Sequence, residues 1–394
     1  MRTLATNRQP LKRNYEITSG TLFEGFESLT GWARTSAGGS AELDAVNVKN
    51  GTNSIKLIPP AGGGDCFYDK TISANLSDAS RITFWLYIPT LTGLNHIAFY
   101  LSSVTNYSKF FSVWYDIAGG RFHKGWNVFS IPRSEWGVTG SEAWTNTFQR
   151  FRVRMNGTGG TSVSFDSVYT KSWNRAKCII TFDDSMTTAY TEGYTYMATK
   201  GLKGTMYNIR AAIDNTGGMT LAQAQTMYDA GWDMSLHGAT NLTTFTYAEM
   251  MADIAYNKQF LLDNGFTRNN CHKHYAYPNG GYNDTVLQAM ADSGMTTART
   301  IIDTTQSHYV EEPYLLSRQG IFNTTTIAEA KAYVDLAIAR GEAILLNFHQ
   351  LVASPTVDTQ WSITNFQALM DYIKQKQDYG FLDVVTISEW YNGL

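Results

Sequence analysis

Two adjacent carboxylates, Asp183 and Asp184, lie in the stretch CIITFDDSMTTAY at residues 178–190. Hydrophobic and β-branched residues lead up to Phe182, so the pair directly follows a segment typical of a buried strand. Like charges this close raise each other's pKa unless a cation lies between or beside them. The pair therefore indicates a metal site, although an isolated pair of this kind is also typical of a helix cap with a solvated neighbour.

Further polar residues follow strand-like segments later in the chain. His237 closes the segment WDMSLH, Asn279 follows KHYAYP, and His349 closes AILLNFH. If these segments are parallel strands of one barrel, the polar residues all lie at the carboxyl ends, where barrel enzymes keep their active sites. Residues with only a structural role would be spread over both ends. We therefore expect these side chains to form one site.

The elements that must position these residues are strands alternating with helices. Capping boxes begin at Thr246 and Thr326, and Gly265 and Gly380 stand where helices should end. The strand-like runs are CIITF, GTMYNI, WDMSLH, KHYAYP, TTARTI, YLLSRQGI, AILLNFH and LDVVTIS. This alternation predicts a compact, distorted (β/α) barrel over residues 173–394, with a doubly wound parallel sheet as the alternative.

The front half of the chain has a different pattern, with short alternating runs separated by Gly, Asn, Ser and Pro. In RFRVRM, residues 150–155, apolar residues alternate with arginines, which is the period of a half-buried strand. Seven or eight such runs predict an all-β sandwich or jelly roll over residues 21–172, preceded by an arm at residues 1–20. Its tryptophans, Trp114 among them, are candidates for stacking on sugar rings, although most tryptophans in a sandwich are core.

Composition excludes several classes of protein. The 394 residues carry a formal net charge of -3 with 16% charged residues, and RQPLKR at residues 8–13 is the only short basic cluster, which argues against nucleic acid as a partner. No apolar run approaches the length of a membrane span. The three cysteines, Cys66, Cys178 and Cys271, are far apart and indicate neither a disulfide framework nor a zinc cluster. The first twenty residues lack the apolar segment of a secretory signal.

Several of these motifs together resemble the polysaccharide deacetylase family of carbohydrate esterases. The resemblance covers roughly residues 174–394 and rests on the order and spacing of TFDDS at 181–185, SLHGATN at 235–241, YAYPNGGYN at 275–283, YLLSRQG at 314–320 and LLNFHQ at 345–350. The front domain loosely resembles jelly-roll carbohydrate-binding modules, in RITFWLYIP and GWNVFSIPRSEW.

The resemblance implies a role for each residue of the expected site. A divalent cation, most simply Zn²⁺, would polarise an acetyl carbonyl and lower the pKa of water toward about 7, and Asp184 and His237 match two of its ligands. Asp183 matches the general base and His349 the general acid. The backbone N–H of Asn279 matches the oxyanion donor, because the preceding proline has none, although Pro-Asn-Gly is also ordinary turn chemistry.

The chain departs from the family pattern at the third metal ligand. The family has His-x-x-x-His, whereas here Asn241 stands four residues after His237. A carboxamide oxygen keeps the charge of the site but binds zinc less well than imidazole, so Asn241 predicts a weakly held metal. The alternative is that Asn241 is only a turn residue, and that His308, His274 or His272 replaces it.

A second departure concerns the arginine that orients the base. The family often has Arg before the Pro loop, where this chain has Ala276. Arg318, on the sixth predicted strand, would face the same pocket and do similar work, or form a structural ion pair. Asn347 stands where an apolar residue lining the acetyl pocket is common, and YAYPNGGYN is similar to the form seen among exopolysaccharide deacetylases.

The sequence therefore predicts a metal-dependent hydrolase that removes N- or O-linked acetyl groups from an exopolysaccharide or capsule-like polysaccharide outside cells. The alternative is a glycan-binding or adhesion protein with weak or no catalysis. A phage tail component, attached to a larger assembly through the N-terminal arm, would fit either reading. A glycoside hydrolase is less favoured, because two adjacent aspartates do not flank a glycosidic bond.

Overall fold

The computed structural model describes residues 20–170, 174–310 and 312–394. The predicted N-terminal arm lies outside this part of the chain, except for Gly20. The chain divides into two compact units: Met1–Asn174 with Ser307–Glu311, and Arg175–Gln306 with Glu312–Leu394. Among the described residues, no helix combines the length and the apolar character needed to cross a bilayer.

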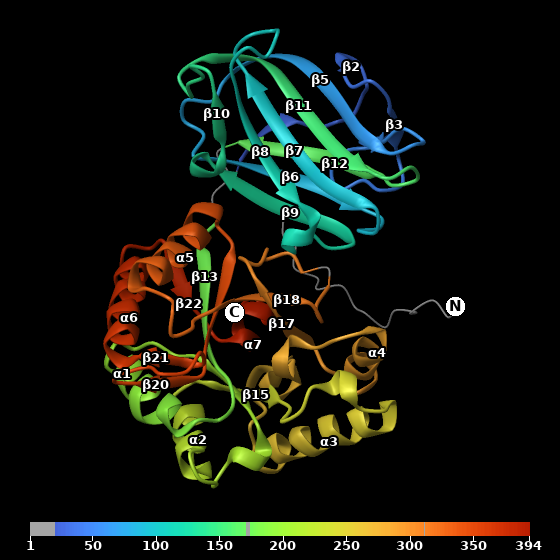
Figure 1. Ribbon diagram of the computed structural model, residues 1–394. Helices are drawn as coiled ribbons and strands as arrows, with labels where there is room; N and C mark the ends of the chain where they lie inside the picture. Colours follow the sequence, from blue (N-terminus) through green and yellow to red (C-terminus); the bar gives the residue numbers. More distant parts are fainter. Residues whose placement is uncertain (1–19, 171–173, 311) are drawn as a thin grey trace. The chain divides into compact units, whose positions relative to one another are not determined.

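The first unit is a β-sandwich of two antiparallel sheets, as predicted (Figure 1). One sheet has the order β3-β4-β12-β6-β9, with β1 also paired to β12, and the other has the order β10-β8-β7-β11-β5-β2. The strands are β1 Thr21–Glu24, β2 Trp32–Arg34, β3 Ser40–Asp44, β4 Ser54–Ile58, β5 Gly64–Asn75, β6 Arg81–Ile88, β7 Leu94–Ser102, β8 Phe110–Asp116, β9 Gly125–Pro132, β10 Gly137–Thr139, β11 Thr147–Gly157 and β12 Val163–Thr170.

The predicted number of seven or eight sandwich strands was too low, since twelve are present among the described residues. The predicted runs are all strands, and in β11 the side chains of Phe151, Val153 and Met155 are buried in the core, as the alternation indicates. The missed strands are very short, as β2 and β10 are, or carry many polar residues, as β3 and β5 do. Such segments gain their strand conformation from pairing with neighbours rather than from their own pattern.

The second unit is a closed barrel of parallel strands. The order is β14-β15-β16-β17-β18-β19-β13, and β13 pairs back to β14, which closes the ring and excludes the doubly wound sheet. β22 pairs with the first half of β13, Ala176–Cys178, whereas β14 pairs with the last two residues of β13, Thr181 and Phe182. The strands are β13 Ala176–Phe182, β14 Thr205–Asn208, β15 Asp233–His237, β16 His274–Ala276, β17 Thr297–Asp303, β18 Leu316–Gly320, β19 Ala343–Phe348 and β22 Leu382–Val384, with the small parallel pair β20 Gln350–Val352 and β21 Gln360–Ser362 outside the ring.

The helices of this unit are α1 Thr195–Thr199, α2 Leu221–Asp229, α3 Tyr247–Asp263, α4 Asp284–Asp292, α5 Ile327–Arg340, α6 Ile363–Asp378 and α7 Ile387–Asn392. Helices such as α2, α3, α5 and α6 lie around the ring (Figure 1), and α7 begins against the first residues of β14 and β15, where Ile387 N donates to Thr205 Oγ1 and Ser388 N to Asp233 Oδ2. Both predicted capping boxes are formed, at Thr246 and Thr326, and two more begin at Thr220 and Thr386. No helix is present between β17 and β18 in the described residues, so the barrel is distorted as predicted.

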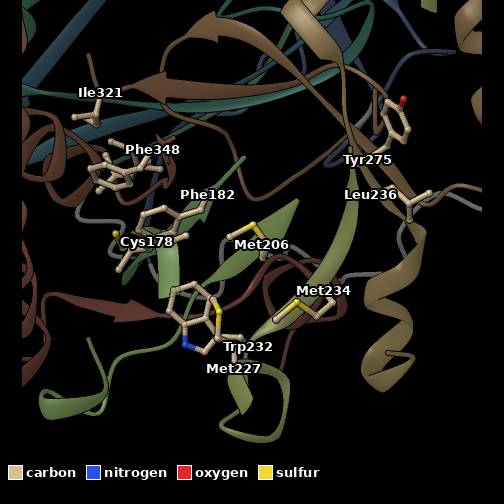
Figure 2. Packing of buried hydrophobic residues seen from close by; sticks show 14 of the residues in the cluster. Cys178, Phe182, Met206, Met227, Trp232, Met234, Leu236, Tyr275, Ile321 and Phe348 are labelled. Atoms are coloured by element: carbon tan, nitrogen blue, oxygen red, sulfur yellow. The ribbon is translucent and has the colours of Figure 1, made fainter. Parts of the chain in front are cut away.

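The packed core of the barrel lies directly below the expected site. Phe182, the last residue of β13, stacks on Phe348 with ring centroids 5.4 Å apart and lies 6.0 Å from the ring of Trp232 (Figure 2). Asp183 follows Phe182, and its backbone N–H donates to Phe348 O at 3.0 Å. The first polar residue after the strand is thus fixed on a rigid apolar layer.

Candidate active site

A pocket of about 380 Å³ opens at the carboxyl ends of the barrel strands. The residues that line it include most of the predicted site residues: Asp183, Asp184, His237, Asn279, Arg318 and His349. Asn241 is absent from this lining. The structure therefore brings six of the seven predicted residues together.

A tight turn after β13 turns both aspartates toward the same pocket. Successive residues of a strand point to opposite faces, so a regular continuation would separate them. Instead, Asp184 and Ser185 take left-handed conformations with φ of 69° and 54°, which non-glycine residues adopt at a cost. The turn is held because Ser185 Oγ accepts from Ile209 N at 3.0 Å and Ser185 O accepts from Met219 N at 2.8 Å.

Asp183 is held by Arg299 of β17. The Arg299 Nη2 donates to Asp183 Oδ2 at 2.5 Å, and both residues are almost fully buried. Burial raises the pKa of this carboxyl, but the guanidinium and the two neighbouring imidazoles lower it more, to about 2. The second oxygen, Oδ1, is buried and has no hydrogen-bond partner among the described residues. Asp183 is thus an ionised carboxylate with one oxygen left for a ligand.

The ring of His237 is oriented by a backbone carbonyl. Its Nδ1 lies 2.7 Å from Ala276 O, so the neutral ring carries its proton on Nδ1 and directs the lone pair of Nε2 into the pocket. Nε2 lies 3.4 Å from Asp184 Oδ1 and 3.9 Å from Asp183 Oδ2. Burial lowers the pKa of His237, but the two carboxylates raise it more, so the net shift is upward. This arrangement favours one positive charge at the centre of the three groups.

A divalent cation fits between Asp184 and His237. Zinc binds imidazole nitrogen at about 2.0–2.1 Å and carboxylate oxygen at about 2.0–2.2 Å, so two ligand atoms on a tetrahedral ion lie about 3.3–3.5 Å apart. The observed separation of 3.4 Å matches this spacing. Among the described residues, however, no three His, Cys, Asp or Glu side chains are grouped to hold a metal ion. The fit therefore covers two protein ligands only.

Asn241, the predicted third ligand, occupies a turn instead. Its Oδ1 accepts from Thr243 N at 3.0 Å and from Thr243 Oγ1 at 2.9 Å, which uses both lone pairs of the carboxamide oxygen. Its side chain also fills the space beside Gly281, where an added Cβ would lie 2.2 Å from Oδ1. The prediction of Asn241 as a ligand is therefore corrected in favour of the alternative, a turn residue that begins the 3-10 helix Leu242–Thr244.

The histidines considered as replacements do not line the pocket either. His274 is buried at the start of β16, with Nδ1 2.8 Å from Thr297 Oγ1, and His272 lies in the segment just before it. His308 belongs to the segment that groups with the first unit. None of these three histidines therefore replaces Asn241 in the described part of the chain.

His349 lies close to Asp183 Oδ2, the same carboxylate oxygen that His237 approaches. The Nε2 of His349 is 3.8 Å from Asp183 Oδ2, and its Nδ1 is buried without a hydrogen-bond partner among the described residues. Burial lowers the pKa of His349 and outweighs the opposing effect of the two aspartates, so the net shift is downward. A neutral imidazole next to an ionised carboxylate can accept a proton and later donate it.

Asn279 also takes a left-handed conformation, with φ of 53°, in the turn that follows β16. The N–H groups of Gly280 and Gly281 close this turn by donating to Tyr277 O and Pro278 O. Among the described residues, the N–H of Asn279 donates to no backbone carbonyl outside its own turn. A donor left unpaired at the pocket rim is suited to an oxyanion.

Arg318 lines the pocket as predicted, but it does not hold the base. Its Nη1 forms an ion pair with Asp303 Oδ1 at 3.1 Å, whereas Arg299 makes the hydrogen bond to Asp183. The predicted orienting role of Arg318 is thus corrected, because β17 rather than β18 places a guanidinium on Asp183. Asn347 lies beside Arg299 and accepts from its Nη1 at 3.4 Å, which explains a polar residue at this position.

Arg299 was missed in the sequence, although a signal was present. It lies in TTARTI, a segment predicted as a buried strand, and a charged residue there must be paired. Asp183 and Asp184 are candidate partners for the charge of Arg299. Sequence spacing alone, however, does not show which strand places its arginine against Asp183.

Comparison with known families gives one match. The family model described as polysaccharide deacetylase matches residues 171–298. This range contains Asp183, Asp184, His237 and Asn279, and it ends one residue before Arg299. No curated protein matches the chain at a significant level.

Solved structures similar to parts of the chain include carbohydrate-active deacetylases and esterases and carbohydrate-binding modules. Streptococcus pyogenes deacetylase PplD in complex with acetate is 23% identical, with 39% of this chain and 69% of that chain covered and a TM-score of 0.35. A family 4 carbohydrate esterase from Streptomyces lividans in complex with acetate is 20% identical, with 53% and 91% covered and a TM-score of 0.38. The family 11 carbohydrate-binding module from Clostridium thermocellum is 15% identical, with 38% and 93% covered and a TM-score of 0.28.

Proposed function

We propose that this chain, which carries a polysaccharide deacetylase domain matched over residues 171–298, removes acetyl groups from a polysaccharide by metal-assisted hydrolysis. One observation carries the proposal: Asp183, fixed and ionised by Arg299, has both His237 Nε2 (3.9 Å) and His349 Nε2 (3.8 Å) near its Oδ2 in one pocket. This is the set of groups that hydrolysis of an acetyl ester or amide requires.

The proposed cation is held by Asp184 and His237. When bound, a divalent cation supplies polarisation of the acetyl carbonyl and favours ionisation of the attacking water. Since the described residues offer two protein ligands, we expect the cation to be removed readily by chelators. Zn²⁺ is the proposed ion, because one imidazole and one carboxylate suit it.

The residues of the chain then divide the proton transfers between them. Asp183 accepts the proton of the attacking water, but a carboxylate whose pKa is about 2 holds a proton weakly. His349, 3.8 Å from the same carboxylate, can take that proton and donate it to the departing oxygen or nitrogen. The N–H of Asn279 stabilises the negative charge that develops on the acetyl oxygen.

Acetate release from acetylated polysaccharides tests this proposal. The purified full chain should release acetate from at least one O-acetylated or N-acetylated polysaccharide, and Asp183→Asn should lower kcat by about 10²- to 10⁴-fold. Asp371→Asn is the matched control, because Asp371 forms an exposed ion pair with Lys200 away from the pocket. Equal rates in wild type and Asp183→Asn would contradict the assignment of the base.

The second candidate function is a glycan-binding protein with weak or no catalysis. It is favoured by the missing third metal ligand and by Trp114 of β8, which is 45% exposed and could stack on a sugar ring. Under this alternative, the chain binds an acetylated glycan, releases no acetate with or without added Zn²⁺, and loses binding in Trp114→Ala. Trp136→Ala is not a suitable control, because Trp136 is buried in the sandwich core.

A further inference from the structure

Arg318 of β18 is a buried cation whose donors are not used by the proposed acetyl-hydrolysing groups. The residue is 5% exposed, and it lines the same pocket as Asp183 and His349. Its Nε is buried and has no hydrogen-bond partner among the described residues, and Nη1 has only the ion pair with Asp303. Buried donors of a charged group are costly unless a partner satisfies them. A pocket-lining guanidinium in this state is suited to a ligand.

The ion pair with Asp303 compensates the charge of Arg318 only in part. Asp303 is 45% exposed, and its Oδ1 also accepts from Gly320 N at 2.9 Å. Water screens such an exposed carboxylate and weakens its hold on the guanidinium. Burial lowers the pKa of Arg318, Asp303 opposes this shift, and the charge of Arg299 adds to it. The net shift of this pKa is downward, so burial and Arg299 outweigh the opposing negative charges of Asp303 and Asp183.

The position of the guanidinium is fixed by its neighbours on the chain. The ring of Phe322 lies 5.1 Å from Arg318 Cζ, in cation–π contact. Gly320 leaves the space that the guanidinium occupies, because an added Cβ there would lie 1.4 Å from Nη1. Arg299, by contrast, is engaged by Asp183 and Asn347. Of these two arginines, Arg318 is the one available to a substrate.

We propose that Arg318 forms an anion subsite beside the proposed acetyl-hydrolysing groups, and that the substrate is an acidic polysaccharide with a carboxylate on or next to the acetylated sugar. This inference rests on the proposed function for the polysaccharide nature of the ligand. A carboxylate is favoured over a phosphate, because its single charge matches one guanidinium and meets less repulsion from the two aspartates across the pocket.

Binding of acidic and neutral oligosaccharides tests the subsite without requiring catalysis. Tetragalacturonate and the neutral xylotetraose are titrated calorimetrically into the full-length wild type and Arg318→Gln. We expect Arg318→Gln to weaken tetragalacturonate binding by about 10- to 100-fold and to leave xylotetraose binding unchanged. Arg175→Gln is the matched control, because Arg175 pairs with Asp383 at the opposite end of β13 and should leave both affinities unchanged.

A second variant tests the geometry while the charge is kept. Gly320→Ala places a methyl group where the guanidinium lies, so the head group must move. We expect Gly320→Ala to weaken tetragalacturonate binding in the same direction as Arg318→Gln. Equal binding of tetragalacturonate by wild type and Arg318→Gln would overturn the proposal, and so would an equal loss for both oligosaccharides.

A kinetic measurement separates the substrate carboxylate from the carboxylate of the product, acetate. Acetate release is followed on O-acetylated polygalacturonate and on the same polymer after reduction of its carboxyl groups. Arg318→Gln should raise KM for the acidic form only. An equal rise in KM for both forms would show that Arg318 binds the acetyl group or acetate, and would overturn the acidic-substrate inference. If wild type releases acetate from neither form but from another acetylated polysaccharide, the proposed function stands; if it releases acetate from no acetylated polysaccharide, the proposed function is contradicted. In both cases the binding measurement still decides the subsite.

Discussion

At the scale of single residues, the site depends on one buried ion pair. Asp183 and Arg299 are 3% and 1% exposed, so each charge depends on the other for compensation. Arg299→Gln should lower the free energy of unfolding by about 3–5 kcal/mol, because it leaves a buried carboxylate without its cation. Denaturant unfolding at pH 7 measures this change.

A double variant separates lost charge compensation from lost packing. In Asp183→Asn with Arg299→Gln both charges are absent, so the unfolding free energy should recover part of the loss seen in Arg299→Gln alone. The matched control is Lys177→Gln, which breaks a partly exposed pair with Asp383 and should cost about 0–1 kcal/mol. Strictly additive losses in the double variant would show that the two charges do not compensate each other.

Asn241 offers a second test at this scale. Because its carboxamide oxygen caps the turn at Thr243, Asn241→Ala should lower the unfolding free energy by about 1 kcal/mol. Its zinc affinity, measured by calorimetric titration, should equal that of wild type. A large loss of zinc affinity in Asn241→Ala would restore the predicted ligand role and contradict the observed turn.

At the scale of elements, the irregular helix after β13 positions the aspartate turn. The π-helix Ala189–Tyr194 packs Gly193 against the ring of Phe182, where an added Cβ would lie 2.8 Å from the ring. Gly193→Ala should destabilise the protein by about 1–3 kcal/mol through overpacking, and it should lower acetate release because Phe182 directly precedes Asp183. The measurements are denaturant unfolding and kcat.

Gly62→Ala is the control for this variant, because no atom lies within 4 Å of the position an added Cβ would take. It should leave the free energy of unfolding unchanged or slightly raise it. If Gly193→Ala behaved like Gly62→Ala, the packing of the π-helix on Phe182 would not be what positions the turn.

The sequence predicts the strands of the barrel well, but it does not predict which side chains on different strands contact each other. The eight strand-like runs are all strands, because parallel strands buried on both faces are continuous apolar segments with clear boundaries. Residues at strand ends, such as His237 and His349, could therefore be placed at one end of the barrel. The partner of Asp183 could not be predicted, because Arg299 and Arg318 lie on adjacent strands and only barrel closure decides which one reaches it.

The turns explain the remaining errors in the predicted site. Asn241 stands at the spacing of a ligand, but its orientation follows from local hydrogen bonds to Thr243. A short polar side chain favours such local bonds, which spacing does not reveal. The left-handed residues Asp184 and Ser185 likewise have no sequence signal as strong as glycine.

At the scale of the whole molecule, a buried histidine makes stability depend on pH. His274 is 1% exposed, and burial lowers its pKa from 6.5 to about 3. Between these values the unfolded chain binds a proton that the folded chain does not, so stability is lost as the pH falls below about 6.5. Between pH 7 and pH 5, wild type should lose about 2 kcal/mol more unfolding free energy than His274→Gln.

The comparison uses the difference between two pH values, so an overall effect of the substitution on stability cancels. Between pH 8 and pH 9 neither folded nor unfolded His274 takes up appreciable protons, and the two proteins should change in parallel there. Identical losses in wild type and His274→Gln between pH 7 and pH 5 would show that His274 is not held neutral by burial.

The measurement that tests the central claim most directly is zinc titration of the metal-free full chain, followed by acetate release. The account predicts that one zinc ion binds per chain and that this ion restores acetate release. It also predicts that His237→Gln and Asp184→Asn each lower zinc affinity by more than about 100-fold, because residues that only hydrogen-bond to a metal ligand already contribute about 10- to 100-fold. Undiminished acetate release from the metal-free chain, or zinc affinity unchanged in both variants, would contradict it.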